Sequence, residues 1–101
     1  MNNDNQSMIG EYVVVTTDKD KGGVFSGFLV ARNSDTIILR QARMVVYWPK
    51  ENHSVVGLAA IGPQNGARIS YACPEIEIFN VTAIMKASDR AKKKFETDLW
   101  D

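Results

Sequence analysis

Short runs of β-branched and aromatic residues, each closed by turn-forming residues, constrain this fold more than any other feature of the sequence. The first run, residues 12–17, consists wholly of such residues and favours a strand on a pleated, half-buried surface. Further runs of similar character occupy residues 24–31, 36–40, 44–48, 68–71, 75–78 and 81–85. In the run at 75–78, polar and apolar residues alternate, so we expect Ile76 and Ile78 to face the core.

Turn-forming residues between these runs indicate how the strands are connected. Gly27 interrupts the second run, and an internal glycine is typical of a bulge or bend that curves a sheet toward a barrel. Residues 33–35 predict a hairpin turn. The runs at 36–40 and 44–48 are either two strands or one long bent strand, which Pro49 ends because it offers no N–H donor.

The middle of the chain departs from the strand pattern. Ser54 is a favourable N-cap, and Gly62-Pro63 is typical of a helix end. Residues 55–61 therefore predict a short helix or helical turn, which Gly57 weakens by roughly 1 kcal/mol relative to alanine.

The end of the chain predicts a second helix, from Ser88-Asp89 to about Leu99. Ala91, Phe95 and Leu99 form a narrow apolar stripe at helical spacing, which we expect to pack on the body of the protein. We expect the basic run at 92–94 to point mostly to water.

Length and composition are those of one domain. The chain has 101 residues, of which 45% are hydrophobic and 24% are charged, and these are ordinary globular values. Residues 1–8 begin with a polar run and predict a disordered tail, which leaves residues 9–101 as a single domain. We predict a β-rich α+β fold: a small bent antiparallel sheet or partial barrel, with a short central helix and a C-terminal helix.

Charge and cysteine content narrow the classes of function. Twelve Lys+Arg balance twelve Asp+Glu, which argues against broad, field-driven binding of nucleic acid. A lone cysteine, Cys73, excludes an intramolecular disulfide framework. No apolar stretch approaches the roughly 18 residues of a membrane span, and residues 1–7 lack the features of a signal peptide. We expect a cytoplasmic protein with no membrane contact.

Residue patterns for catalysis are sparse. His53 is the only histidine and could pair with Cys73 as a thiol nucleophile, but no flanking signature supports such a pair. We expect instead a loop histidine and a small buried thiol. Glu75 and Glu77 share a strand face and predict a solvated surface rather than an acid–base pair. We therefore predict no enzyme activity, no metal site and no cofactor.

Arginines and aromatic residues offer a better case for binding. An arginine presents a planar fork to phosphate or carboxylate, and an aromatic ring can stack on a base. If the turn at 62–66 folds toward Tyr47-Trp48, an anion-and-base pocket forms from Arg40, Arg43, Tyr47, Trp48, Arg68 and Tyr71. The alternative is that Tyr47 and Trp48 complete the core while Arg68 pairs with a surface carboxylate.

The order of several segments resembles an uncharacterised family of small tailed-phage and prophage proteins. These segments are GEYVVVTTDK (10–19), GVFSGFLV (23–30), ARMVVYW (42–48), GLAAIGP (57–63), RIS (68–70) and VTAI (81–84). The resemblance covers nearly the whole chain and implies a phage-encoded accessory protein, with no activity to transfer.

A fainter resemblance, within residues 23–42, is to Sm-like RNA-binding barrels. Val24, Gly27, Leu29, Val30 and Leu39 are similar to the bent-strand core of the first Sm motif. The motif's acidic residue followed by Met-Asn is absent, so the resemblance carries over no RNA-binding residue. It implies a small, strongly bent sheet, whose edges favour pairing with another copy of the chain.

Together these observations predict a phage or prophage accessory protein that binds without catalysis, as a homo-oligomer. The favoured ligand is a nucleotide-type anion, such as a host defence signal. The alternatives are an Sm-like module that binds RNA or DNA, and a structural virion or assembly protein.

Overall fold

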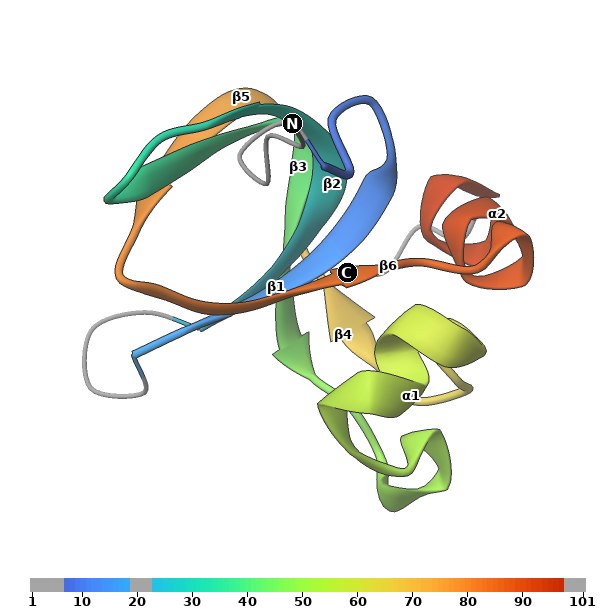
Figure 1. Ribbon diagram of the computed structural model, residues 1–101. Coiled ribbons are helices and arrows are strands. Elements are labelled where there is room, and N and C mark those ends of the chain that lie inside the picture. Colours follow the sequence, from blue (N-terminus) through green and yellow to red (C-terminus); the bar gives the residue numbers. More distant parts are fainter. Residues whose placement is uncertain (1–6, 19–22, 98–101) are drawn as a thin grey trace.

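Six strands and two α-helices make up the computed structural model, which describes residues 7–18 and 23–97 (Figure 1). Their bounds are β1 Tyr12–Thr17, β2 Val24–Arg32, β3 Thr36–Tyr47, α1 Ser54–Ala60, β4 Arg68–Ile69, β5 Cys73–Phe79, β6 Val81–Lys86 and α2 Asp89–Thr97. A short 3-10 helix, η2, spans Lys50–Asn52 before α1. The predicted β-rich α+β fold, with a central and a C-terminal helix, is confirmed.

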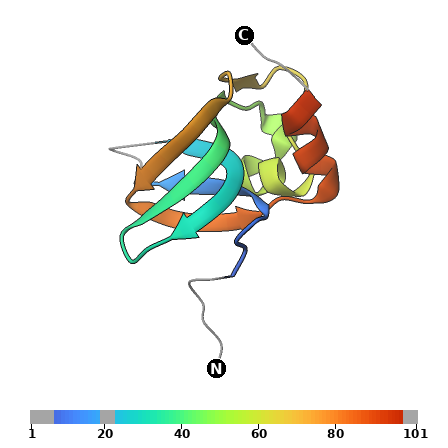
Figure 2. The same cartoon turned by 90° about the horizontal axis from the view of Figure 1, so that it is seen from above.

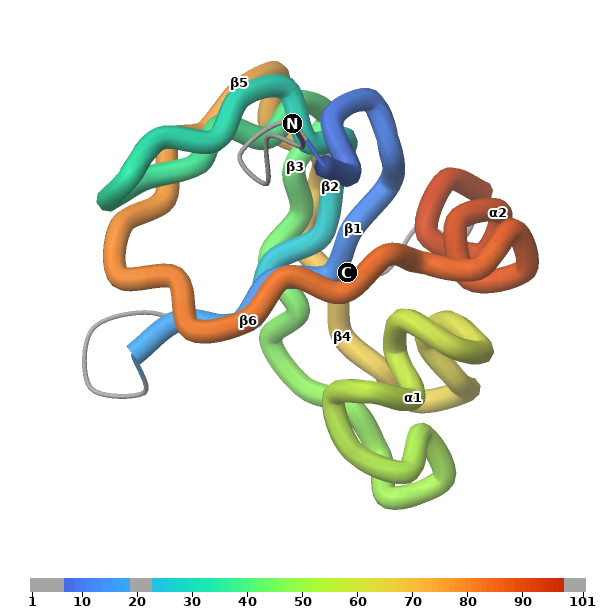
Figure 3. The backbone as a smooth tube through the Cα atoms, viewed as in Figure 1, coloured from blue at the N-terminus to red at the C-terminus, as the bar shows by residue number. Residues whose placement is uncertain are grey.

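All strand pairs are antiparallel and join into one strongly curved sheet. The order is β4-β3-β2-β1-β6, and β5 pairs with the same edge of β3 as β4, nearer to the start of that strand. β5 runs into β6 through Asn80, whose φ is 60°, yet the two strands do not pair. The described sheet is therefore a partial barrel that does not close. Figure 3 shows its curved path, with β5 continuing into β6.

The long strand β3 settles the alternative left open for residues 36–48. The two predicted runs form one bent strand, Thr36–Tyr47, which ends before Pro49. The turn at 33–35 is confirmed as the β2–β3 hairpin, closed by a hydrogen bond from Asn33 N to Thr36 O of 2.8 Å. β4 is shorter than the predicted run, because only Arg68 and Ile69 pair with β3.

Two hydrophobic cores lie on the two faces of this sheet. The first, here called the helix core, includes Tyr12, Val14, Val45, Ile69, Leu58, Ala91 and Phe95. The second, the sheet core, is built from strands alone and includes Val13, Val15, Leu29, Ile37, Leu39, Ala42 and Ile78. Alternate side chains of β1 enter different cores, so that strand is covered on both faces. Figures 1 and 2 show α1 and α2 together on one side of the sheet.

Helix α1 depends on a close backbone approach that sequence reasoning did not foresee. A Cβ at Gly57 would overlap the backbone carbonyl oxygen of Asn52. The Asn52 side chain is buried, donates to Gly62 O at 2.8 Å and accepts from Gln64 N at 3.0 Å. Glycine at 57 lowers helix propensity, but it is what lets η2 pack against α1.

Helix α2 packs on the sheet through Ala91 and Phe95, as predicted. The expectation that the basic run points mostly to water is wrong for two of its lysines, because Lys92 and Lys94 are half-buried. Lys92 Nζ lies 5.3 Å from the centre of the Phe28 ring, a cation–π contact that holds its stem on the sheet. Leu99, the third residue of the predicted stripe, lies outside the described residues.

At the other end of the chain, the backbone before β1 contacts the sheet. Gly10 N donates to Leu29 O at 2.8 Å, Met8 packs against the sheet core, and Ser7 accepts a hydrogen bond from Arg32 at 2.9 Å. Residues 1–6 of the predicted tail lie outside the described residues, so the tail stays a prediction.

Candidate functional site

A β-bulge in β3 directs an arginine toward the helices. Ser26 of β2 pairs with Arg43 and Phe28 pairs with Arg40, so one strand advances by one residue more than the other. The extra residue is Gln41, which adopts the left-handed conformation with φ 52°. Bulges re-aim the side chains that follow them.

The effect of the bulge is visible in which residues of β3 reach each core. Ile37 and Leu39 enter the sheet core, and without an insertion Arg43 would share their face. After Gln41 the alternation of side chains between the two faces shifts by one residue. Ala42 therefore enters the sheet core, while Val45 enters the helix core. Arg43 accordingly faces the helix side of the sheet.

Gly27 is the residue of β2 that lies opposite the bulge. A Cβ at this position would lie 2.9 Å from Arg40 O and 3.2 Å from Ala42 Cα. Because both neighbours are backbone atoms, no side-chain rotation relieves the clash. The bulge predicted from Gly27 is thus confirmed, with the extra residue in the facing strand.

A cavity of about 230 Å³ lies beside the Arg43 side chain, on the helix side of the sheet. Strands β1, β2 and β3 supply its floor, α2 supplies one wall, and the segment between β4 and β5 supplies another. The lining residues are Tyr12, Phe28, Gln41, Arg43, Ala72, Phe95 and Glu96. Charged, amide and aromatic side chains therefore converge on one hollow between sheet and helix.

Arg43 is the charged group at the base of this cavity. Its exposed fraction is only 7%, and its Nη1 donates to Ser70 O at 3.0 Å. Within residues 7–18 and 23–97, no carboxylate lies within 4.0 Å of the guanidinium. A guanidinium has several further N–H donors, so one hydrogen bond leaves most of its bonding capacity unused.

Tyr12 supplies a polar group and an aromatic face to the same cavity. Its hydroxyl lies 3.0 Å from Ser26 Oγ, and its ring contacts those of Phe28 and Phe95 at centroid distances of 5.1 and 5.6 Å. Burial raises the pKa of Tyr12 to about 12, although the Ser26 hydrogen bond and the charge of Arg43 lower it. The hydroxyl is therefore neutral at physiological pH.

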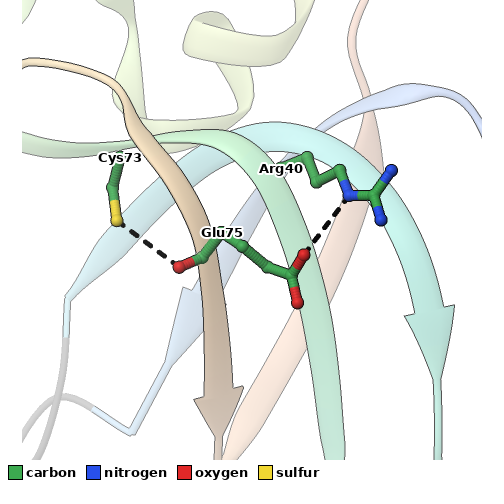
Figure 4. A network of polar contacts seen from close by, with 3 residues as sticks. All are labelled: Arg40, Cys73 and Glu75. Carbon is green, nitrogen blue, oxygen red and sulfur yellow. Dashed lines mark hydrogen bonds and ion pairs between the residues drawn. The ribbon is translucent and has the colours of Figure 1, made fainter.

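The six residues predicted to form one pocket are distributed over separate places. Arg43 lines the cavity, whereas Arg40 is exposed and forms an ion pair with Glu75, with 3.3 Å between Nε and Oε1 (Figure 4). Tyr47 and Arg68 are partners across β3 and β4, and both are exposed.

The remaining aromatic residues of the predicted pocket differ in burial. Trp48 packs partly against the helix core, in line with the alternative interpretation, while Tyr71 is 74% exposed.

The turn at 62–66 does approach this region, since a Cβ on Gly66 would lie 4.0 Å from the Pro49 ring. No carboxylate among the described residues lies within 4.0 Å of Arg68.

The residues considered for catalysis do not converge. His53 is exposed, with φ 61°, just before α1. The expectation of a buried thiol is wrong: Cys73 is exposed, because it stands at the first position of the edge strand β5, and it donates to Glu75 O at 3.4 Å (Figure 4). Glu75 and Glu77 are exposed, as predicted.

The described part of the chain offers neither a metal-binding cluster nor a membrane-spanning helix. No group of three or more His, Cys, Asp or Glu side chains is placed to hold a metal ion there. None of the helices in residues 7–18 and 23–97 combines the length and apolar character that crossing a membrane requires.

Sequence reasoning found Arg43 but missed its neighbours. The sequence placed Tyr12 and Phe28 in predicted strands and Phe95 in the apolar stripe of the second helix. Glu96 was one of several charged residues of that helix. Gly27 was the residue that could have predicted this grouping. A bulge opposite Gly27 moves the later residues of β3, including Arg43, to the other face of the sheet.

Comparison with known proteins yields a family and no further relative. No curated protein and no solved structure matches the chain. A family described as a domain of unknown function, DUF6948, matches residues 10–95 and so includes β1 to β6 and the cavity-lining residues other than Glu96. The chain belongs to the DUF6948 family.

Proposed function

We propose that this protein binds a small anionic ligand of nucleotide type in the cavity at Arg43, without converting it chemically. The observation that carries the proposal is the burial of the Arg43 guanidinium with no carboxylate within 4.0 Å among the described residues. In a phage-encoded protein, which the sequence resemblance implies, such a ligand would be a host signal.

The energetic argument starts from the charge. Moving an ion out of water costs several kcal/mol of free energy even after relaxation. The hydrogen bond from Arg43 to Ser70 O offsets only part of this desolvation penalty. A phosphate or carboxylate would supply the missing countercharge and could accept two parallel N–H bonds from the guanidinium. The cavity beside Arg43 leaves room for such a group.

The walls of the cavity suit a planar ring. The half-buried ring of Phe28 contributes apolar surface, backed by the buried rings of Tyr12 and Phe95, and ligand sites commonly combine apolar walls with a few polar groups. The volume of about 230 Å³ lies below the roughly 300 Å³ at which sites for drug-sized ligands begin. A nucleotide would therefore be held by part of its structure, with the rest outside.

The absence of an activated nucleophile among the lining residues supports binding without catalysis. These residues include a neutral tyrosine, an amide and a carboxylate, but no histidine, cysteine or serine. Catalysis of group transfer usually needs a nucleophile held against a base.

Calorimetric titration with a panel of linear and cyclic nucleotides tests the proposal. We expect at least one member to bind the wild-type protein, and Arg43→Met to lower its affinity at least tenfold. Arg40→Met is the matched control, because Arg40 lies on the same strand but pairs with Glu75 outside the cavity. No heat with any member at high protein concentration would overturn the proposal.

A second candidate function is binding of single-stranded RNA or DNA. The observation that favours it is the exposure of Tyr47 (52%) beside its strand partner Arg68, with Tyr71 exposed after β4. Exposed aromatic rings next to arginine form stacking surfaces for bases. This candidate predicts an affinity that falls steeply with salt and with Tyr47→Ala, whereas nucleotide binding in the cavity would not respond to that substitution.

A further inference from the structure

The cavity that holds Arg43 also holds an acid. Glu96, on α2, lines the same hollow, yet no described lysine or arginine lies within 4.0 Å of its carboxylate. Arg43 is buried whereas Glu96 is exposed, so the carboxylate belongs to the outer part of the cavity lining. The cavity is thus dipolar: it presents one buried cation and one rim carboxylate that do not pair with each other.

This dipole restricts the ligands that the cavity can accept. An anionic group is attracted to Arg43, but a second negative charge near Glu96 would be repelled. An ionised carboxylate only accepts hydrogen bonds, so the ligand must offer N–H donors on that side. The rings of Tyr12, Phe28 and Phe95 line the same cavity.

We infer that the cavity selects a ligand with a single negative charge at Arg43, a planar ring along the aromatic wall, and N–H donors directed at Glu96. The inference rests on the proposed function and deepens it, because it names the class of ligand. Polyanions such as nucleoside triphosphates are excluded from the same position by the charge of Glu96.

Two kinds of small molecule share this chemistry. A cyclic guanosine monophosphate has one phosphodiester charge and a base whose N1–H and 2-amino group can donate together to one carboxylate. An aromatic amino acid such as tryptophan has a carboxylate, a ring and an ammonium group. Adenine offers a ring acceptor where guanine offers N1–H, so adenine nucleotides should bind more weakly.

Matched pairs of probes test the inference by calorimetry. The first pair is cyclic GMP and cyclic IMP, which lacks the 2-amino group; the second is tryptophan and indole-3-propionate, which lacks the ammonium. For at least one pair we expect the donor-bearing member to bind at least tenfold more tightly to the wild-type protein. Which pair shows the preference distinguishes the nucleotide from the amino acid.

Glu96→Gln should reduce that preference to less than threefold, since an amide can no longer accept two charge-assisted N–H bonds. Glu51→Gln, an exposed acidic residue of η2 outside the cavity, is the matched control and should leave the preference unchanged. Because Glu96 is exposed, the variant should unfold at the temperature of the wild type.

The outcomes separate the two claims. If no nucleotide binds, or if nucleotide binding ignores Arg43→Met, the proposed function fails. If probes bind through Arg43 but both members of each pair bind equally, or Glu96→Gln leaves the preference intact, only the dipolar selection is overturned.

Discussion

At the scale of single residues, Arg43 and Tyr12 bring polar groups into the interior on the helix side of β1 and β3. Ser26 forms a hydrogen bond with the Tyr12 hydroxyl and is the strand partner of Arg43. The tyrosine is therefore satisfied within the protein, whereas the arginine keeps unused donors toward the cavity. This difference lets the two residues be tested separately.

Replacing Arg43 by methionine should separate a functional from a structural role. Methionine keeps most of the volume and removes the buried charge, so we expect the free energy of unfolding to stay unchanged or to rise by about 1–2 kcal/mol. Urea unfolding of the two proteins measures the difference. A loss of more than about 1 kcal/mol would identify Arg43 as a structural residue, and the ligand proposal would lose its main support.

Tyr12 predicts a loss of stability in alkali. Its pKa is raised from 10.0 to about 12 in the folded protein, so between these values the unfolded chain releases the phenolic proton while the folded protein retains it. The free energy of unfolding should therefore fall as pH rises from 10 to 12, by about 2–3 kcal/mol in total, and this group should have no effect below pH 10.

Urea unfolding at several pH values from 8 to 12 checks this expectation. In Tyr12→Phe the fall should be shallower by that amount, although the variant should be less stable at pH 8 because Ser26 loses its buried partner. Tyr47→Phe, at an exposed position, is the control. Equal slopes in Tyr12→Phe and wild type would contradict the assignment.

At the scale of elements, the decisive feature is the bulge that Gln41 adds to β3. It turns the strand so that its two halves serve different cores. The extra residue also places Arg43 beneath α2 rather than among Ile37 and Leu39 of the sheet core. The candidate site therefore exists because β2 and β3 are out of step by one residue.

Gly27→Ala should disturb this arrangement. Its Cβ would meet Arg40 O at 2.9 Å, so the bulge must shift, and we expect a loss of about 1–3 kcal/mol in the free energy of unfolding, together with weaker ligand binding. Gly23→Ala is the matched control, because its Cβ would meet only the flexible end of Met44 and should cost less than about 1 kcal/mol. Similar losses in both variants would argue against a special role for the bulge.

At the scale of the whole molecule, the curved sheet remains open between β5 and β6. Each of these strands has one partner in the described sheet, β3 and β1 respectively, and so presents a free edge. Free edges pair readily with other chains. We propose that these free edges let copies of this protein associate, as the sequence predicts.

A mass measurement in solution tests this association. We expect a dimer or a larger closed oligomer at micromolar concentration, and we expect Ala83→Lys, a charge on the exposed surface of β6, to shift the population toward monomer. A monomer at all concentrations up to the millimolar range would contradict the proposal.

Much of the fold follows from local residue patterns. The strands at β1 and β6, the hairpin at 33–35, the inward positions of Ile76 and Ile78 and the two helices were all predictable. These features depend on neighbours in the chain, through β-branched runs, turn residues and the spacing of apolar side chains. The arginine at the candidate site was also identified, together with five residues that the structure places elsewhere.

What the sequence alone determined is therefore the set of elements and their apolar faces, since a residue's propensity and periodicity are local properties. Only the tertiary structure decided which polar side chains meet. The extra residue of β3 moves Arg43 to the helix side of the sheet. The packing of α2 brings Phe95 and Glu96 to the same cavity as Tyr12 and Phe28. Strand register and helix docking depend on contacts between residues far apart in the chain, and a single sequence does not record those distances.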